Sequence, residues 1–395
     1  MPINSRIVLF GRVLAKENVD VFLITHTADI RWLTNFAGVF DSEQAHAALV
    51  LCTKKQGDTR PETCPPDTLG NGLFLHSDSR YSEALRALNV ASGSAWRISD
   101  ERVGHSTFVA QTLQAHFTGD DRSNPVRIGI ESDLRLDLYR ALEKALAKEC
   151  SFAWELVELP QLVMELRARK DADEIERLRA AQALCDQTFK HMLTVLAPGM
   201  TEKEAALELD FFMRRAGADD VAFPTIVASG PNSARPHAVP GERVLQKGDF
   251  VLMDFGVQLA DYRSDMTRTV VLGSASKRQR SIYEAVLAAQ LAAKELIAPG
   301  ITAKEAHQAA DACIEAAGFG GHFTHGLGHG VGIDIHELPV LGPKVETKLE
   351  PGHVFTLEPG IYIEGEGGVR IEDFGVVTAD GFETFTQSPH ELVEL

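Results

Sequence analysis

Four acidic residues in the C-terminal half lie where a carboxylate is costly to bury. Asp254 and Glu358 each end an apolar run, FVLMD and VFTLE, and a second acid, Asp265 or Glu372, follows each run after a turn. A buried carboxylate without a partner is unfavourable, so a cation should face each of them. If the two segments face each other, the four anions converge on one site. Two divalent metal ions would then supply the compensating charge.

The segments around these acids belong to an internal repeat. Ala197–Ala205 (APGMTEKEA) recurs as Ala298–Ala306 (APGITAKEA), with seven of nine positions identical and an offset of 298 − 197 = 101. Each copy holds a Thr followed three residues later by a Glu, the capping box that begins a helix. Each predicted helix runs to a glycine, Gly217 or Gly318, that can end it in left-handed geometry. We therefore expect one helix-and-strand unit used twice.

Histidine side chains are the other candidate metal ligands. Four of the 14 histidines fall in GGHFTHGLGHGVGIDIHE, at positions 322, 325, 329 and 336. The spacing from His325 to His329 is that of two zinc ligands on one helix, but the interleaved glycines disfavour a helix there. The segment instead predicts a glycine-rich strand or loop that approaches a site closely, and one of its imidazoles could complete a metal centre.

The first half of the chain is predicted to be a separate α/β domain. Apolar runs beginning at Val19, His46, Gly72 and Val126 alternate with helical patterns such as SEALRAL and LDLYRALEKALAKE. From about Glu165 a long charged helix is expected, and the domain boundary is placed after residue 162. Between the second and third runs, the polar, proline-containing residues 53–71 predict a long surface loop, either a tolerated insertion or an oligomer contact.

Composition excludes several classes of function. The 395 residues carry 39 basic and 56 acidic side chains, so 39 − 56 = −17, which argues against a nucleic-acid or anionic-membrane partner. No apolar run is long enough to span a membrane, and the N-terminus lacks the pattern of a signal peptide. Five scattered cysteines without a C-x-x-C pair favour a reduced, cytoplasmic protein.

The acids and one histidine also match a known family. Their order, within LMDFG, SDMTRT, GLGHGVG, TLEPGIY and VRIED, resembles the pita-bread metallopeptidases, the group of prolidase, aminopeptidase P, methionine aminopeptidase and creatinase. The resemblance covers about residues 165–395 and extends more weakly into the first half through DIRWLTNF and SDSRYSEA. Methionine aminopeptidases usually lack such a first domain, so the chain is most similar to the prolidase branch, in particular to bacterial Xaa-Pro dipeptidases.

The resemblance implies an α+β fold with two domains. Residues 163–395 would form the pseudo-twofold pita-bread catalytic domain, and residues 1–162 the smaller creatinase-type α/β domain. Two divalent ions per subunit are implied, manganese first and cobalt or zinc as alternatives, since oxygen-rich ligation with one imidazole suits such ions. By motif position, the metal ligands would be Asp254 on one ion, His329 and Glu358 on the other, and Asp265 and Glu372 bridging both.

The implied reaction is hydrolysis of the bond before a proline. The ions would polarise the scissile carbonyl and activate a water molecule, and Glu358 would shuttle the proton to the leaving nitrogen. His237 and His336 match the family's two substrate-facing histidines and are the other predicted catalytic residues, able to stabilise an oxyanion or orient substrate. Phe223 would wall the proline pocket. Arg370 would bind substrate or clamp a ligating carboxylate.

One departure from the family pattern concerns the substrate. Many prolidases carry an arginine after the HELP motif that grips the carboxylate of a dipeptide, and this chain has Val340 there. Either another cation serves, for instance from a partner subunit, or longer Xaa-Pro peptides are accepted. The alternative function is a non-peptidase hydrolase or lyase of small amidic substrates, creatinase-like or ectoine-hydrolase-like; a pseudoenzyme is disfavoured by the complete ligand set. Proline-containing peptides and a homodimer or larger homo-oligomer are the expected partners.

Overall fold

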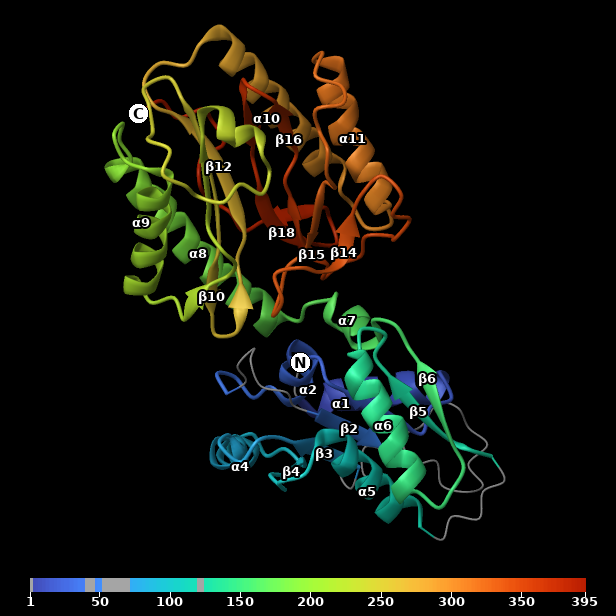
Figure 1. The fold of residues 1–395 in the computed structure, drawn as a ribbon. Coiled ribbons are helices and arrows are strands. Elements are labelled where there is room, and N and C mark those ends of the chain that lie inside the picture. The colour runs from blue at the N-terminus through green and yellow to red at the C-terminus, as the bar shows by residue number, and fades with distance from the viewer. Residues whose placement is uncertain (1–2, 40–46, 52–71, 119–123) are drawn as a thin grey trace. The chain divides into compact units, whose positions relative to one another are not determined.

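The chain forms two compact units, each with its own sheet and helices. A computed structural model describes residues 3–39, 47–51, 72–118 and 124–395 (Figure 1). The units comprise Met1–Leu166 and Arg167–Leu395. The predicted loop at 53–71 lies outside the described residues. No helix within the described ranges is long and apolar enough to cross a membrane.

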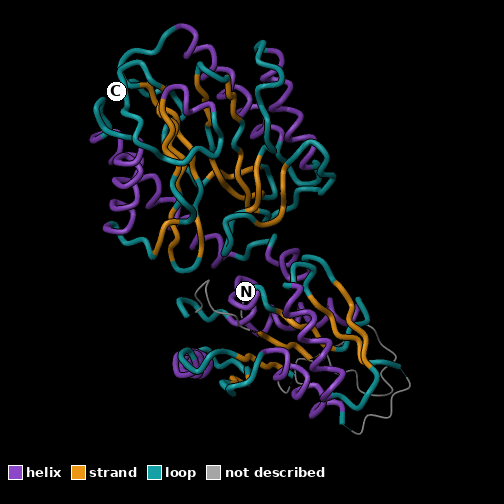
Figure 2. Tube along the Cα trace, in the orientation of Figure 1, coloured by secondary structure: helices purple, strands orange, loops and turns teal. Residues whose placement is uncertain are grey.

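The first unit is a mixed six-stranded sheet with helices (Figure 2). Its strand order is β4-β3-β2-β1-β5-β6, and β1, β5 and β6 run parallel, whereas β2 is antiparallel to both of its neighbours. The alternating runs of the sequence correspond to these strands, which confirms the α/β prediction for this half. The elements are α1 Ile3–Lys16, β1 Val21–Ile24, α2 Thr27–Thr34, β2 Ala47–Leu51, β3 Leu73–His76, α4 Ser82–Ala91, β4 Arg97–Ser99, α5 His105–Phe117, β5 Val126–Ile130, α6 Leu136–Glu149 and β6 Trp154–Glu158.

The second unit contains the repeat as two similar halves. In the first half, α8 and α9 accompany the sheet β12-β9-β8; in the second, α10 and α11 accompany the sheet that contains β15 and β18. Both predicted capping boxes are present, because Thr201 and Thr302 each accept the backbone N–H of the Glu three residues on. Gly217 and Gly318 follow the helix ends with positive φ, as expected. The pseudo-twofold prediction is confirmed at the level of these elements.

The remaining elements of the second unit fill in this plan. Short strands and one 3₁₀ turn connect the main strands, and a two-stranded sheet, β16-β17, lies outside the two larger sheets. Helix α7, Leu162–Arg167, lies in the first unit except for its last residue, and the elements of the second unit are α8 Ala172–Val195, α9 Glu202–Arg215, β7 Asp220–Val221, β8 Ile226–Ser229, η1 Gly230–Ala234, β9 Phe250–Phe255, β10 Val257–Leu259, β11 Tyr262–Arg263, β12 Met266–Val271, α10 Lys277–Leu296, α11 Ala303–Ala316, β13 Gly328–Gly330, β14 Glu337–Leu341, β15 Val354–Leu357, β16 Gly360–Ile363, β17 Gly367–Arg370, β18 Asp373–Val377 and β19 Phe382–Thr384.

The long charged helix starts later than the sequence suggested. The prediction from about Glu165 is wrong for residues 168–171, which separate α7 from α8. Asp171 forms a complete capping box with Glu174 and so begins α8 at the next residue. Before it, the Lys170 N–H donates to the Gly352 carbonyl at 2.9 Å, a contact that a continuous helix would not allow. Tertiary pairing therefore overrides helix propensity at this point.

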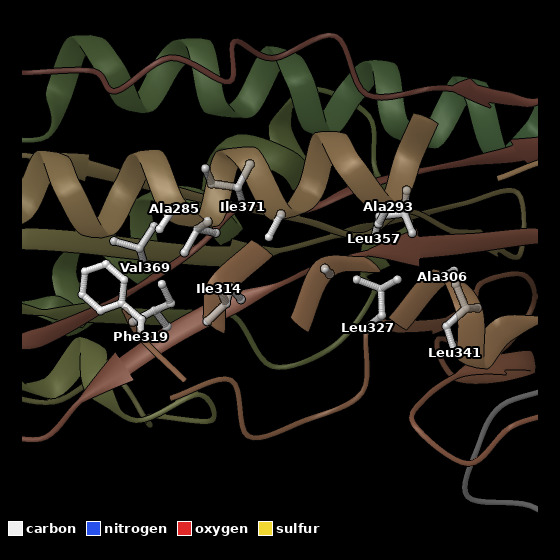
Figure 3. Close-up of a cluster of buried hydrophobic side chains, with 14 of the residues drawn as sticks. Ala285, Ala293, Ala306, Ile314, Phe319, Leu327, Leu341, Leu357, Val369 and Ile371 are labelled. Carbon is white, nitrogen blue, oxygen red and sulfur yellow. The ribbon is translucent and has the colours of Figure 1, made fainter. Parts of the chain in front are cut away.

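Each half of the second unit has its own apolar core. One cluster joins the inner faces of α10 and α11 to the strands of the second half, and it includes Ile314, Phe319, Leu327 and Leu357 (Figure 3). The other joins α8 and α9 to β9 and β12. All six residues of β9 and all six of β12 are buried. Strands buried on both faces are held rigidly by packing, so they can present side chains at fixed positions.

Candidate metal centre

The strand pairing brings the four acids of the repeat to corresponding places. Asp254 lies on β9 opposite Thr267 of β12, and Asp265 directly precedes β12. In the other half, Glu358 directly follows β15, and Glu372 directly precedes β18, which pairs with β15. The Glu372 N–H donates to the carbonyl of Thr267 at 3.1 Å, so the two halves meet at this point.

The acids lie close together and are largely buried. Residues Asp254, Asp265 and Glu372 are 8%, 4% and 1% exposed. Asp265, His329 and Glu372 each offer a ligand atom within 4.8 Å of the others. Glu358 Oε1 lies 3.4 Å from His329 Nε2, and Asp265 Oδ2 lies 3.5 Å from the same nitrogen. Four carboxyl groups and one imidazole thus surround one small space.

This crowding changes the proton affinity of the acids. Burial is the largest cause and mutual repulsion the next, and together they raise the pKa of Asp265 and of Glu372 well above the ordinary value. The pKa of Glu358 is raised to about 7 by burial and by the Asp254 charge, against the effect of Arg370. Without added cations the site therefore holds protons near neutral pH, which is the behaviour expected of metal ligands lacking their metal.

His329 is oriented to offer a lone pair to this space. Its strand β13 is the glycine-rich strand that the sequence predicted, and a Cβ at Gly328 would lie 2.0 Å from the Thr356 carbonyl oxygen. The Nδ1 of His329 lies 3.1 Å from the Gly330 carbonyl, which fixes the proton on that nitrogen and leaves Nε2 toward the acids. Burial lowers the pKa of His329, so the imidazole is neutral and can act as a ligand.

The donor set fits a pair of divalent ions on independent grounds. Asp254 Oδ1 and Glu372 Oε1 are buried, with no hydrogen-bond partner among the described residues. Buried carboxylate oxygens are normally satisfied, so each of these atoms points to a missing partner. Carboxylate oxygens with one imidazole and no thiolate suit hard or borderline divalent cations.

Arg370 is the cation already present beside the acids. Its Nη2 donates to Asp254 Oδ2 at 2.5 Å, its Nη1 to the Tyr362 hydroxyl at 2.9 Å and its Nε to Thr267 Oγ1 at 2.9 Å. The Thr267 hydroxyl donates onward to Glu372 Oε2 at 2.6 Å. Two roles were predicted for Arg370, and its contact with Asp254 is the one expected of a clamp on a carboxylate. The other role, binding of substrate, stays a prediction. One positive charge among four carboxyl groups still leaves an excess of negative charge.

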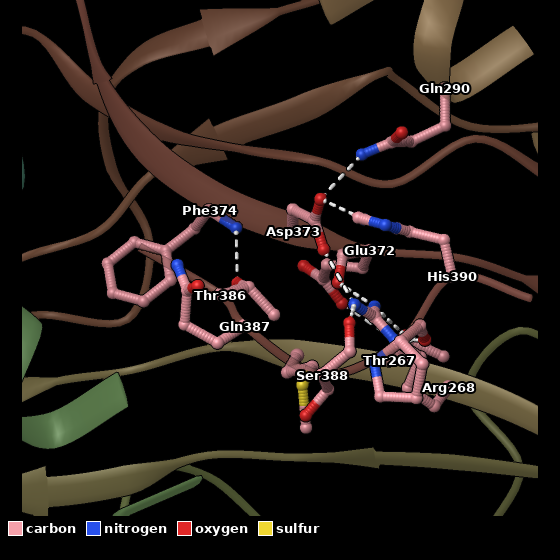
Figure 4. A network of polar contacts seen from close by, with 12 residues as sticks. Thr267, Arg268, Gln290, Glu372, Asp373, Phe374, Thr386, Gln387, Ser388 and His390 are labelled. Carbon is pink, nitrogen blue, oxygen red and sulfur yellow. Dashed lines mark hydrogen bonds and ion pairs between the residues drawn. The ribbon is translucent and has the colours of Figure 1, made fainter. Parts of the chain in front are cut away.

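A second buried network lies behind Glu372 (Figure 4). Arg268 donates to the Glu372 carbonyl at 2.6 Å and to Asp373 Oδ1 at 2.8 Å. The other oxygen of Asp373 accepts from Gln290 at 2.9 Å and lies 2.6 Å from His390 Nε2. Arg268 also donates to the carbonyl of Ser388 at 2.8 Å. The backbone that carries Glu372 is therefore tied to β12, α10 and the C-terminal segment.

All the predicted site residues line one pocket of about 590 Å³. The five predicted ligands share it with the predicted substrate residues Phe223, His237, His336 and Arg370. The ring of His336 lies edge-on to that of His329, with 4.4 Å between centroids, and burial lowers the pKa of His336. Val340 also lines the pocket and is 44% exposed. The structure thus brings the whole set together, while their roles stay predictions.

Sequence reasoning missed several side chains of this site. Tyr362, whose pKa is raised to about 12 by burial, joins Arg370 to His325 Nε2, 2.8 Å from its hydroxyl. Tyr362 stands in the TLEPGIY motif, but nothing in the motif indicates its partner. Thr356 is the other omission: its hydroxyl accepts the His329 N–H and donates to Glu358. A hydroxyl two residues before a predicted ligand is a weak signal that could have identified it.

Known proteins resemble this chain along its whole length. A family model described as metallopeptidase family M24 matches residues 176–379, and one described as the creatinase/prolidase N-terminal domain matches residues 6–169. The uncharacterized peptidase YqhT of Bacillus subtilis is 45% identical over 389 residues, 98% of each protein. The Xaa-Pro dipeptidase of Pyrococcus furiosus is 40% identical over 234 residues, 59% of this chain and 66% of that protein. The solved Xaa-Pro dipeptidase from Bacillus anthracis has a TM-score of 0.85 at 34% identity, covering 99% of this chain and 100% of that one.

The raised pKa of Glu358 predicts how the metal-free protein responds to pH. Between the ordinary value of 4.5 and about 7, the folded state holds a proton that the unfolded chain releases, so stability falls as pH rises through this window. We expect the melting temperature of metal-free wild type minus that of metal-free Glu358→Gln to decrease as the pH rises from about 5 to about 8. Thermal unfolding of both proteins in the presence of a chelator measures this difference. A divalent ion should abolish the trend, and a relative rise with pH would contradict the electrostatic account.

Proposed function

This chain belongs to metallopeptidase family M24, and from that premise we propose that it hydrolyses the peptide bond between an N-terminal residue and a following proline. Its relatives include proteins named Xaa-Pro dipeptidase, in sequence and in solved structures. The observation that carries the proposal is the single pocket in which the five predicted ligands lie together with His237, His336 and Phe223. The family uses divalent metal ions, and we propose manganese, with cobalt or zinc as alternatives.

The proposed metal ligands are the residues that the sequence indicated: Asp254, Asp265, His329, Glu358 and Glu372. Bound ions would supply Lewis acidity toward the peptide carbonyl and would lower the pKa of a water molecule. Arg370 holds Asp254, and Thr267 and Thr356 hold Glu372 and Glu358 by hydrogen bonds. These contacts fix the direction of each carboxylate, so little reorganisation is needed during the reaction.

We assign the transfer of the proton in this reaction to Glu358. Its carboxylate can accept a proton from water and give it to the proline nitrogen as the C–N bond breaks. His336, whose pKa is lowered by burial, stays neutral and still has one N–H to donate to the carbonyl oxygen as negative charge develops there. We assign His237 to the same pocket face as a substrate-orienting group. Phe223 provides a flat apolar wall suited to a pyrrolidine ring.

Location and assembly follow from the sequence only. We propose a cytoplasmic homodimer or larger homo-oligomer that acts on small proline-containing peptides. Cys150, Cys185 and Cys313 are free thiols, and Cys185 is buried, which supports a reducing compartment. Analytical ultracentrifugation would measure the oligomer.

The reaction itself is tested with metal analysis and a substrate panel. Purified protein loaded with Mn²⁺, Co²⁺ or Zn²⁺ should bind two ions per chain and hydrolyse Ala-Pro or Ala-Pro-Ala, but not Ala-Ala. Chelation should abolish turnover, and the metal should restore it. Metal-loaded protein that is inert on every Xaa-Pro peptide but hydrolyses creatine, or another small amide, would overturn the proposal in favour of a non-peptidase hydrolase.

The proton-shuttle role predicts a specific loss in Glu358→Gln. The amide cannot accept the proton, so kcat should fall by at least about a hundredfold, the usual range for a lost general base. Metal content, measured by mass spectrometry, serves as the control, because the amide oxygen can still coordinate an ion. Full metal content with undiminished turnover would exclude Glu358 as the shuttle.

Val340 predicts how the enzyme discriminates between dipeptides and longer peptides. Among the described residues that line the pocket, Arg370 is the one Lys or Arg side chain, and it is engaged with Asp254. A dipeptide's carboxylate near Val340 therefore has no uncommitted Lys or Arg partner among the described residues that line this pocket. We expect Val340→Arg to raise kcat/KM for Ala-Pro about tenfold relative to Ala-Pro-Ala, the effect of one hydrogen bond to a charged group. As a control, Val340→Met introduces a long side chain without a charge and should leave the ratio of the two kcat/KM values unchanged.

A further inference from the structure

The loop that carries His336 into the pocket is held in shape by the side chain of the next residue, Glu337. Glu337 turns back over the loop, and its Oε1 accepts the N–H of Asp334 at 2.9 Å. A Cβ at Gly332 would lie 2.4 Å from Glu337 Oε2, so the carboxylate rests against a glycine that leaves it room. The carbonyl of Gly332 accepts the N–H of Arg263 at 2.9 Å. His336 therefore projects from a short loop whose shape depends on where the Glu337 carboxylate lies.

Two cations determine where that carboxylate lies. Lys170 Nζ donates to Glu337 Oε2 at 2.9 Å, and Arg167 Nη2 donates to Glu337 Oε1. Arg167 Nη2 also donates to Asp334 Oδ2 at 2.8 Å, on the other side of His336. The side chains of Arg167, Lys170 and Glu337 are 1–2% exposed. Burial alone would raise the pKa of Glu337, but Arg167 and Lys170 outweigh it and lower the pKa to about 2.

The same cations belong to a segment that also contacts the strand leading to Glu358. Arg167 ends α7, and Lys170 lies just before α8. The Lys170 N–H donates to the Gly352 carbonyl at 2.9 Å, and Arg169 forms a β-bridge with His353, immediately before β15. Strand β15 leads directly into Glu358. The four residues 167–170 thus contact the His336 loop through side chains and the Glu358 strand through backbone.

A buried ion cluster of this kind is better suited to orientation than to stability. Removing charges from water offsets most of the Coulomb attraction, so such clusters add little net stability. Charge-assisted hydrogen bonds are short and directional, however, and they fix the positions of the atoms they join. A displacement of about 1 Å in a group that contacts the substrate can lower a rate by about a hundredfold.

We propose that Arg167 and Lys170 are positioning residues for the reaction, and that through Glu337 they hold His336 at its place in the pocket. This inference rests on the proposed function, in which His336 contacts the substrate. The two cations contribute no group of their own to the pocket lining. Their effect on the reaction passes through His336.

The test is a double-mutant cycle between Lys170→Met and His336→Ala in the full-length, metal-loaded protein. Lys170→Met removes one cation and leaves the Lys170 backbone contact with Gly352 in place. In the wild-type background we expect kcat/KM for Ala-Pro-Ala to fall at least about tenfold. In the His336→Ala background the same change should cost less than about twofold, because its target is gone. Equal losses in both backgrounds would overturn the proposal.

Asp249→Asn is the matched control. It removes a partly buried ion pair, Arg243–Asp249, in the same unit, and neither residue lines the pocket. Its effect on kcat/KM should be the same with and without His336. If Lys170→Met does not fold, as its metal content and melting temperature would reveal, Lys170→Gln supplies the same cycle. It also removes the cation that pairs with Glu337, but it keeps a polar side chain, so it is the milder change.

A second readout separates this inference from the proposed function. If wild type hydrolyses no Xaa-Pro peptide, the proposed function fails, and the position of His336 is followed by NMR in protein with ¹³C-labelled histidine rings. The His336→Ala spectrum identifies its resonance. Lys170→Met should shift or broaden this resonance while Asp249→Asn leaves it unchanged. A His336 resonance that is identical in Lys170→Met and wild type would overturn the positioning role.

Discussion

The mutual repulsion of four buried carboxyl groups is the constraint on which the rest of this structure depends. Asp254, Asp265, Glu358 and Glu372 lie around one space with a single arginine beside them. Burial and repulsion push the pKa values of Asp265, Glu358 and Glu372 upward, so gathering these charges is unfavourable unless a cation balances them. Such an arrangement persists only if the surrounding scaffold holds it, and the scaffold accordingly consists of strands buried on both faces.

Duplication explains how one chain assembles four acids. Each copy of the repeat supplies a strand pair with one acid near each strand end, and two helices cover the pair. A single copy would present two acids to water. Two copies that meet at the hydrogen bond between Glu372 and Thr267 largely bury the acids. The histidine strand β13 belongs to the second copy only, so the site is symmetric in its acids and asymmetric in its imidazole.

Around the acids, four buried cations hold different parts of the site in place. Arg370 holds Asp254 directly. Arg268 holds the backbone of Glu372 and connects it to Asp373 and the C-terminal segment. Arg167, together with Lys170, holds the loop of His336. Guanidinium groups suit these places because they stay charged when buried and offer several donors in a rigid plane. The arrangement of the pocket therefore depends in part on side chains that do not line it, namely Arg167, Lys170 and Arg268.

Local patterns in the sequence were enough to predict the repeat, the capping boxes and the strands that carry the acids, and the resemblance to a known family implied the set of residues that share the pocket. These features depend on residue spacing within one element, or on a motif read as a unit. The patterns suggested a carboxylate partner for Arg370, but they could not identify it as Asp254, 116 residues away. They gave no indication that Lys170 pairs with Glu337, 167 residues away. The same holds for the interruption at 168–171, where pairing with Gly352 prevents the helix that propensity favours. A charged side chain has many possible partners in the linear chain, and only packing decides which of them it meets and at what distance from water.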